Sequence, residues 1–273
     1  MKTIAVLLTC HNRKEKTLIC LKYLFNCSLP KEHAIDVYLV DDGCTDGTPQ
    51  AIREQFPQVN IIQGDGNLYW NRGMHLAWET AAKAKNYDYY LWLNDDTNLY
   101  PNALEKLIYA CSATGNNALI CSTLQSAITY KSTYGGRKSS QLLIPNGELQ
   151  ECESMNGNCV LVPHSIYEKV GNLDYVFRHA IGDLDYGYRV RQAGFRLYVS
   201  SNYLGTCENN PSLPKWCLKS TPFYQRVKSL YSPLSYAEPI PFFIYEKRHF
   251  GLLVAIKHFI SIHIRLIFPQ LCK

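Results

Sequence analysis

Short apolar runs alternate along the first half of the chain with longer stretches in which apolar residues recur at helical spacing. The runs at 4–8, 35–40, 59–62 and 89–93 are rich in β-branched and aromatic residues and predict strands. The stretch at 71–85 predicts a helix. Strands that alternate with helices in this way predict an α/β fold with a mostly parallel, doubly wound sheet flanked by helices.

The alternation weakens after residue 110. Residues 125–153 are rich in Ser, Thr, Tyr, Gly and Lys, which predicts loops or a hairpin around Asn146-Gly147. A further strand at 157–164 and a short helix at 165–170 follow. We therefore expect one large domain over residues 1–210 and a C-terminal helical extension over residues 211–273.

Composition narrows the possible functions. With 273 residues and 47% hydrophobic content, the chain can bury the core of a large domain and an appendage. The net charge of +5 is modest, and the scattered Lys and Arg residues argue against a nucleic-acid partner. The eleven cysteines form no Cys-x-x-Cys pair, and none has a His at zinc-finger spacing. Because no secretory signal is visible at the N-terminus, we expect a reduced, cytoplasmic protein.

Two adjacent acids follow the apolar strand at 89–93, in the segment Asn94-Asp95-Asp96. Asp is depleted in strands and an unpaired buried charge is costly, so a cation is expected beside them. Mg²⁺ or Mn²⁺ prefers carboxylates, water and substrate phosphates as ligands, which indicates a metal ion and a diphosphate substrate. The alternative is a pair of solvated turn acids that cap a helix starting near Pro101.

Polar segments follow four of the predicted strands, at 9–13, 41–42, 64–71 and 94–96. Ligands of open parallel sheets bind beyond the carboxyl ends of the strands, so these four segments are expected to share one rim. The first strand does not open onto Gly-x-Gly-x-x-Gly, and the sequence has no P-loop motif. Phosphate would therefore be held mainly by metal and side chains.

Asp183 and Asp185 stand two residues apart, preceded by Gly182 and followed by a predicted helix with Arg189 and Arg191. A helix N-terminus favours the ionised form of an acid. An ionised carboxylate that faces a metal-diphosphate site is what a general base for a sugar hydroxyl requires. The alternative makes Asp183 a helix cap and Asp185 a first-turn acid.

Four segments follow one another in a fixed order: Thr9-Cys10-His11-Asn12-Arg13, Asp41-Asp42-Gly43-Cys44-Thr45-Asp46-Gly47-Thr48, Leu93-Asn94-Asp95-Asp96 and Gly182-Asp183-Leu184-Asp185. Together they resemble the ordered motifs of family 2 glycosyltransferases with the GT-A fold. The resemblance covers residues 3–207. The segment Gly66-Asn67-Leu68-Tyr69-Trp70 and the Asp183 segment are similar to rhamnosyltransferase-like members that act in bacterial surface polysaccharide synthesis.

The resemblance implies an inverting glycosyltransferase that depends on Mg²⁺ or Mn²⁺. It would move a hexosyl or deoxyhexosyl group from a nucleotide-diphosphate sugar donor to a hydroxyl of a glycan or lipid-linked glycan acceptor. Residues 1–100 would form the nucleotide-binding half, and residues 101–210 the half that holds the acceptor and the catalytic base.

On the donor side, the resemblance places Thr9 and His11 along the nucleotide, with His11 in place of a usual Tyr. It places Asp41 at the edge of the base and Asp42 toward the ribose. The loop after the third strand adds three expected substrate contacts, at Gly66, Asn67 and Trp70. Trp70 has two alternative roles: its ring contacts the sugar or nucleotide, or it packs in the core.

The segment Asn94-Asp95-Asp96 matches the family's Asp-x-Asp motif. Asp96 would ligate the metal, Asn94 would approach the ribose, and Asp95 is counted with the substrate-binding residues. Asn94 departs from the usual acid, so its contact is neutral. Many members also bind metal through a His after the next strand, where this chain reads Gly205-Thr206-Cys207-Glu208. Diphosphate and water would then complete the metal's ligands, or Cys207 or Glu208 would approach it.

Asp183 falls at the family's catalytic base, although the Glu that commonly precedes it is Gly182 here. Asp185 is the rival for that role. The base would take the proton from an acceptor hydroxyl that attacks the anomeric carbon, and the product would be inverted at that carbon.

The C-terminal extension has a composition of its own. Residues 250–268 are highly apolar but carry Lys257, His258, His263 and Arg265, too many polar groups for a membrane span. A basic amphipathic helix lying on an anionic inner leaflet fits this composition. The alternative is a helix packed on the catalytic domain or on the partner in a homodimer.

Two other functions share part of this pattern. A sugar-1-phosphate nucleotidyltransferase also uses a metal and an α/β sheet, but the Gly-rich first loop expected of it is absent here. A non-catalytic sugar-nucleotide-binding module is the second alternative, since the usual Glu and His are replaced.

Overall fold

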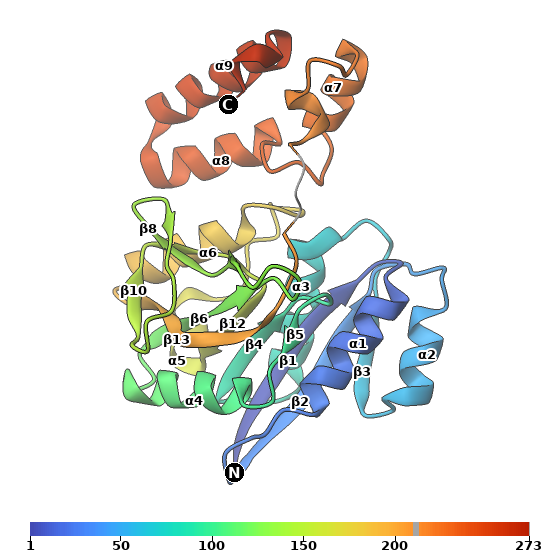
Figure 1. The fold of residues 1–273 in the computed structure, drawn as a ribbon, viewed down its shortest axis with the longest axis vertical. Coiled ribbons are helices and arrows are strands. Elements are labelled where there is room, and N and C mark those ends of the chain that lie inside the picture. The colour runs from blue at the N-terminus through green and yellow to red at the C-terminus, as the bar shows by residue number, and fades with distance from the viewer. Residues whose placement is uncertain (210–212, 273) are drawn as a thin grey trace.

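The computed structural model describes residues 1–209 and 213–272 and consists of a larger α/β domain and a lobe of C-terminal helices (Figure 1). The larger domain is built on a ten-stranded sheet. The main path of the sheet runs through β10 (Gln150–Cys152), β13 (Arg196–Thr206), β6 (Ala118–Gln125), β12 (Cys159–Pro163), β4 (Tyr89–Leu93), β1 (Lys2–Cys10), β2 (His33–Asp41) and β3 (Val59–Gln63). Two short strands lie off this path: β5 (Asn98–Leu99) pairs with β13, and β7 (Ser132–Tyr134) pairs with β6.

Four of the seven neighbouring pairs on the main path are parallel. The strands β4, β1, β2 and β3 run in one direction, β12 is antiparallel to both of its neighbours, and β13 is parallel to β6. β1 is a continuous apolar run because both of its faces are buried. Ile4, Val6 and Leu8 belong to one core cluster, and Ala5 and Leu7 belong to the other.

Helices cover both faces of the sheet. The first core cluster contains residues of α1 (Lys14–Phe25), α2 (Thr48–Gln55) and α4 (Ala103–Ala113). The second contains residues of α3 (Tyr69–Ala84), α5 (His164–Val170) and α6 (Gly182–Gln192). The predicted fold class, a mostly parallel, doubly wound sheet flanked by helices, is confirmed.

A small second sheet consists of β11 (Ser154–Met155), β8 (Gly136–Lys138) and β9 (Gln141–Leu142). β8 and β9 form a hairpin, and its turn residues Ser139 and Ser140 have φ values of 47° and 67°. Of the two alternatives expected here, the hairpin around Asn146-Gly147 is wrong, because β9 and β10 on either side of that turn belong to different sheets. The other alternative, a loop, is what residues 143–149 form.

The C-terminal lobe is helical, as predicted. It contains η1 (Lys215–Cys217), α7 (Phe223–Leu230), α8 (Pro239–Phe250), α9 (Leu252–Ile267) and η2 (Pro269–Leu271). Trp216, Leu230, Ile262 and Leu266 form a core of its own. Gly251, with a φ of 94°, separates α8 from α9, so the helix expected within 250–268 begins after this glycine. In the part of the chain that the structure describes, no helix is long and apolar enough to cross a bilayer.

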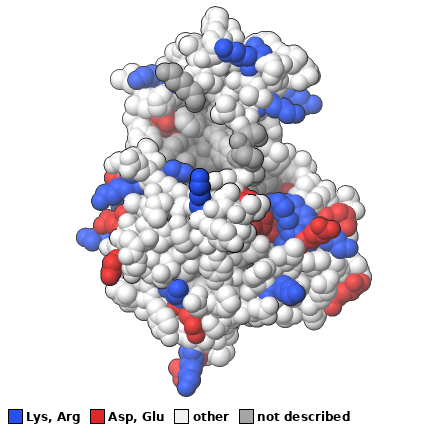
Figure 2. Space-filling model, viewed as in Figure 1, with Lys and Arg blue, Asp and Glu red and all other residues white. Residues whose placement is uncertain are grey.

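The lobe is attached to the larger domain through side chains of α8 and the segment before it. Tyr245 of α8 clusters with Phe177 and Ile181, which precede α6. Arg178 forms an ion pair with Glu238 at the start of α8. On the face shown in Figure 2, a hollow lies between the lobe and the larger domain.

Candidate active site

The strand register brings the predicted polar segments to one edge of the sheet. β1 and β2 are parallel with Cys10 beside Asp41, and β1 and β4 are parallel with Leu7 beside Trp92. The segments that follow these three strands therefore leave the sheet on the same side. Asp41, Asp42 and Asp95 are almost completely buried there.

Asp42 organises the loop that leads into α3. Its carboxylate accepts hydrogen bonds from the backbone amides of Gly66 (2.8 Å), Leu68 (3.0 Å) and Tyr69 (2.9 Å). These amides stand at the N-terminus of α3, where the helix dipole favours a negative charge. Gly43 allows the loop to come close, since a Cβ at this position would lie 2.8 Å from the Cα of Gly66.

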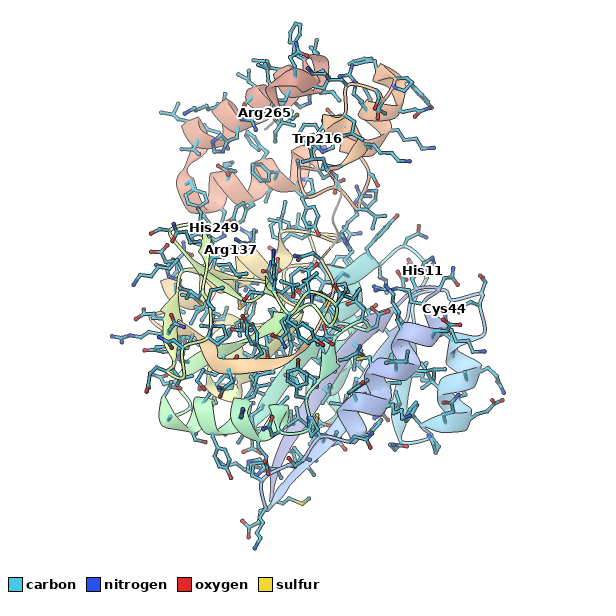
Figure 3. All side chains as sticks on the ribbon, viewed as in Figure 1. His11, Cys44, Arg137, Trp216, His249 and Arg265 are labelled. Carbon is cyan, nitrogen blue, oxygen red and sulfur yellow. The ribbon has the colours of Figure 1, made fainter. Side chains whose placement is uncertain are left out.

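His11 and Asp41 lie beside this loop. The Nδ1 of His11 donates to the carbonyl oxygen of Asp42 at 2.5 Å, and this leaves Nε2 to accept from the side chain of Asn12. Asp41 accepts a hydrogen bond from the amide of Cys44 at 2.8 Å. The labelled side chains of His11 and Cys44 lie together at this end of the sheet (Figure 3). The ring of His11 is exposed, so it offers a flat surface at the rim.

Arg13 supplies the cation beside the two adjacent acids. Its guanidinium lies 2.9 Å from Asp95 and also forms an ion pair with Asp96. Burial raises the pKa of Asp95 to about 7, and the positive charge of Arg13 opposes this shift. The alternative in which both acids cap the next helix is wrong, because α4 begins only at Ala103.

Asp96 is the more accessible of these two acids, with 27% of its side chain exposed. The thiol of Cys207 lies 3.6 Å from its Oδ1, and burial raises the pKa of that thiol to about 12, so it is a poor metal ligand in this state. Glu208 accepts a hydrogen bond from the amide of Ala127 at 2.7 Å. Among the described residues, no group of three or more His, Cys, Asp and Glu side chains could hold a metal ion. A carboxylate such as Asp96 fits a hard cation that takes its remaining ligands from diphosphate and water.

Trp70 connects the two acidic segments. Its Nε1 donates to Oδ1 of Asn94 at 2.6 Å, and its six-membered ring contacts Gly157, where a Cβ would lie 2.6 Å from the ring. The amide of Gly157 in turn donates to Oδ2 of Asp183 at 2.8 Å. Trp70 also packs edge-on against Trp92 of the core, with ring centroids 6.2 Å apart. One edge of Trp70 is thus held in the core while its indole nitrogen lies at the site.

Asp183 stands in the first turn of α6. The residue that caps this helix is Ile181, so the alternative that makes Asp183 the cap is wrong. Burial raises the pKa of Asp183, and hydrogen bonds from the amides of Gly157 and Leu184 oppose the shift. A Cβ at position 182 would lie 1.8 Å from Oδ1 of Asn71. This close approach leaves no room for a side chain at position 182.

Asp185 points away from the site and is completely buried. It accepts hydrogen bonds from Arg189 at 2.8 Å, from Arg248 at 2.6 Å and from His249 at 2.9 Å. The last two belong to α8, and Figure 3 shows His249 at the junction between the lobe and the larger domain. Asp185 therefore links the lobe to α6 through these contacts.

The remaining predicted contacts lie along the rim. Thr9 faces α3, and its Oγ1 would lie 2.3 Å from a Cβ at Gly73. Gly66 is half-buried, and Asn67 is exposed, with its amide donating to Asp65 at 2.8 Å. The structure thus gathers the predicted donor-side residues, Trp70 and Asp183 at one edge of the sheet and separates Asp185 from them.

Several residues of this region were not predicted as site residues. Arg13 was visible only as part of a polar loop. His179 lies in the loop before α6, and burial, followed by the charge of Arg13, lowers its pKa to about 4. Asn71 anchors the same loop through hydrogen bonds to the carbonyl oxygens of Asp174 (2.8 Å) and Phe177 (2.9 Å). No spacing rule connects such distant residues, so they become apparent only after folding.

Comparison with protein families agrees with this geometry. Residues 5–171 match the family model described as Glycosyl transferase family 2. Since the match covers more than half of the chain, the protein belongs to glycosyl transferase family 2 and is a glycosyltransferase. The predicted family and the predicted class of enzyme are confirmed.

Two curated proteins are similar to part of the chain. The chain is similar to two proteins named N-acetylglucosaminyl-diphospho-decaprenol L-rhamnosyltransferase, from Mycobacterium tuberculosis strains CDC 1551 / Oshkosh and ATCC 25618 / H37Rv. Each is 26% identical over 213 residues, which are 66% of this chain and 69% of the relative.

Solved structures show the same fold. The crystal structure of S. aureus TarS matches with a TM-score of 0.58 and 14% identity, over 92% of this chain and 44% of TarS. TarS 1–349 in complex with UDP matches with a TM-score of 0.56 and 14% identity, over 92% of this chain and 72% of that one. At this identity the likeness concerns the fold alone. The chain spans less than half of the longer TarS chain.

Proposed function

We propose that the protein transfers a hexosyl or deoxyhexosyl group from a nucleotide-diphosphate sugar to a hydroxyl of a glycan or lipid-linked glycan, with inversion at the anomeric carbon. The observation that carries the proposal is the line of contacts from Asp183 through Gly157 and Trp70 to Asn94. It puts a carboxylate suited to proton abstraction on the same site as the acids suited to a diphosphate-bound cation.

The relatives support a role in polysaccharide synthesis. Two of them are named for rhamnosyl transfer to a saccharide on a decaprenol diphosphate, and a structural neighbour was solved with UDP. We therefore propose a role in bacterial surface polysaccharide synthesis. The proposed place is the cytoplasm, where the eleven cysteines, all free in the structure, stay reduced.

Asp183 is the proposed base. Hydrogen bonds from the amides of Gly157 and Leu184 orient its carboxylate, and burial makes it more basic by raising its pKa. It accepts the proton of the acceptor hydroxyl while that oxygen bonds to the anomeric carbon. The bond from this carbon to the diphosphate oxygen breaks, and its electron pair leaves with the nucleoside diphosphate. Asp185 is not proposed as the base, because its carboxylate is buried between α6 and α8.

The donor side is proposed to bind the nucleotide along the rim. His11 and Asp41 would contact the base, with Thr9 beneath them. Asp42 contributes by shaping the loop whose residues Gly66 and Asn67 approach the donor, since its own carboxylate is engaged by backbone amides of that loop. The indole of Trp70 holds the amide of Asn94, which would face the ribose.

Asp96 is the proposed ligand of Mg²⁺ or Mn²⁺. When bound, such a cation supplies positive charge to the leaving diphosphate. Asp96→Ala is therefore expected to weaken binding of a nucleoside diphosphate in Mn²⁺ by about tenfold or more, since a charge-assisted contact is lost. Isothermal calorimetry with and without Mn²⁺ measures this, and an affinity equal to that of the unaltered protein would remove Asp96 from the metal site.

Asp183→Asn tests the proposed base. An amide cannot accept the proton, so we expect transfer to fall by about a hundredfold or more while nucleotide affinity stays nearly unchanged. Glu148→Gln, at an exposed loop acid, is the matched control and should transfer at the normal rate.

In the unaltered protein the rate of transfer should rise with pH as Asp183 ionises, with a midpoint above the usual range of a carboxylate because burial raises the pKa of Asp183.

The same assays separate the other functions. Turnover retained in Asp183→Asn would move the base elsewhere. A nucleotidyltransferase would make a nucleotide sugar from a nucleoside triphosphate and a sugar 1-phosphate. A binding module would bind the donor without transfer to acceptor or water.

A further inference from the structure

The outermost helix of the C-terminal lobe, α9, has an exposed apolar face. Its members recur every three or four residues and are each 42% to 83% exposed: Leu253, Ile256, Ile260, Ile264 and Ile267. The opposite face of the same helix holds Ala255, Ile262 and Leu266, which are buried. The helix thus uses one apolar side for the lobe core and leaves a second one uncovered. We call the exposed side the α9 face.

The charges around the α9 face are positive. Lys257 and Arg265 are exposed on the same helix, and Figure 3 shows Arg265 on the lobe. The acids described in the lobe, Glu238 and Glu246, are both buried and lie against Arg178 and His258, respectively. On the face drawn in Figure 2, the described atoms of the outer part of the lobe are blue or white. A partner with negative charges and an apolar interior would complement this surface.

The position of α9 leaves it open to a broad partner. In Figure 1, α9 lies at the end of the molecule farthest from the sheet, with α8 between it and the larger domain. A flat surface could therefore contact α9 without touching the larger domain. Sixteen residues of helix are too few to cross a bilayer but enough to lie along its interface.

We propose that the α9 face docks on an anionic phospholipid bilayer, with the helix axis parallel to the membrane plane. The isoleucine and leucine side chains enter the region between headgroups and acyl chains, and Lys257 and Arg265 meet the lipid phosphates. A second copy of the chain fits this face less well. Two α9 faces in contact would bring four such cations together without an exposed acid of the described lobe to pair with them.

Flotation of the full chain with vesicles tests the proposal. Vesicles of equal parts phosphatidylcholine and phosphatidylglycerol should carry the protein, and vesicles of phosphatidylcholine alone should carry much less. The double variant Ile256→Glu/Ile260→Glu should partition at least about tenfold more weakly, because two apolar contacts are replaced by charges that the lipid repels. Ile144→Glu is the matched control, since Ile144 is 55% exposed in the larger domain and Ile260 is 52% exposed.

A second pair of variants tests the electrostatic part. Lys257→Gln and Arg265→Gln should each lower partition into the anionic vesicles by about fivefold at low salt. Circular dichroism confirms that each variant is folded. Equal flotation of the unaltered protein and the Ile256→Glu/Ile260→Glu variant would overturn the proposal. So would a dimer in sedimentation equilibrium that the same variant converts to monomer while no vesicle binding is seen.

These outcomes are independent of sugar transfer. A protein that floats but shows no transferase activity would support membrane docking of the α9 face and contradict the proposed function. A protein that transfers sugar but does not float would support the proposed function and contradict membrane docking.

Discussion

Burial shifts the pKa values of two titratable side chains near the site in the direction that favours their neutral forms. Burial raises the pKa of Asp95 to about 7 and lowers the pKa of His179 to about 4, because each loses the water that would stabilise its charge. Arg13 acts on both in opposite senses: it favours the charged form of Asp95 and disfavours that of His179. Arg13 therefore provides a permanent positive charge at the end of the site where a diphosphate is proposed to bind.

His179 makes the stability of the protein sensitive to acid. In the unfolded chain a His has a pKa of about 6.5, so as the pH falls the unfolded state takes up the proton before the folded state does. The contribution of His179 is fully present above about pH 6.5 and is lost toward about pH 4, with a total of about 3 kcal/mol. His179→Gln should lose less stability between these limits in urea unfolding. Equal losses in both proteins would show that another group takes up the proton.

The start of α6 is held in place by residues of other helices. Ile181 adopts a φ of 77°, an uncommon conformation for a β-branched residue, and it directly precedes the helix that carries Asp183. Local preference does not favour this geometry. Asn71 of α3 contacts Gly182, and Asp185 is held by residues of α8. The position of the proposed base therefore depends on two other helices.

Arg248 is a measurable part of that support. It bonds Asp185 at 2.6 Å and Asp174 at 2.7 Å, so Arg248→Gln removes two charge-assisted contacts of α6 and its preceding loop. We expect the free energy of unfolding to fall by about 2 kcal/mol. Arg265→Gln, on the exposed side of α9, should change it by less than about 0.5 kcal/mol. Urea denaturation compares the two, and similar values would show that the contacts of Arg248 contribute no net stability.

At the scale of the whole molecule, the C-terminal lobe is part of the structure that supports the site. It has a small core of its own, but its α8 also shares an apolar cluster with Phe177 and Ile181 and places Arg248 and His249 against Asp185. A chain without the lobe would expose this cluster and leave Asp185 with Arg189 as its one described ion-pair partner. The division into domains at residues 1–210 and 211–273 stays a prediction. Residues on both sides of this boundary hold the start of α6 in place.

A fragment that ends at residue 209 should therefore be less stable than the full chain. Breaking a buried charge network of this kind costs about 3 to 5 kcal/mol, and exposing the cluster around Phe177 adds to this. Urea unfolding followed by tryptophan fluorescence measures the difference. The same midpoint in fragment and full chain would show that the lobe folds independently of the site.

Much of the fold, and the gathering of polar segments at one edge of the sheet, could be predicted from local patterns. Burial of β1 and β4 on both faces requires continuous apolar runs, and polar residues such as Asp41 and Asp95 can follow such runs only where the strands end. The roles of Asp183 and Asp185 could not be separated in this way. Both are acids in the first turn of one helix, and only their partners distinguish them.

The sequence by itself determined the α/β alternation, the order of the motifs and the amphipathic character of the last helix, because each depends on the spacing of neighbouring residues. The tertiary structure decided which acids face the site, that Arg13 lies between Asp95 and Asp96, and that α8 holds Asp185. Such contacts join residues many positions apart, and their geometry depends on packing that no local pattern records.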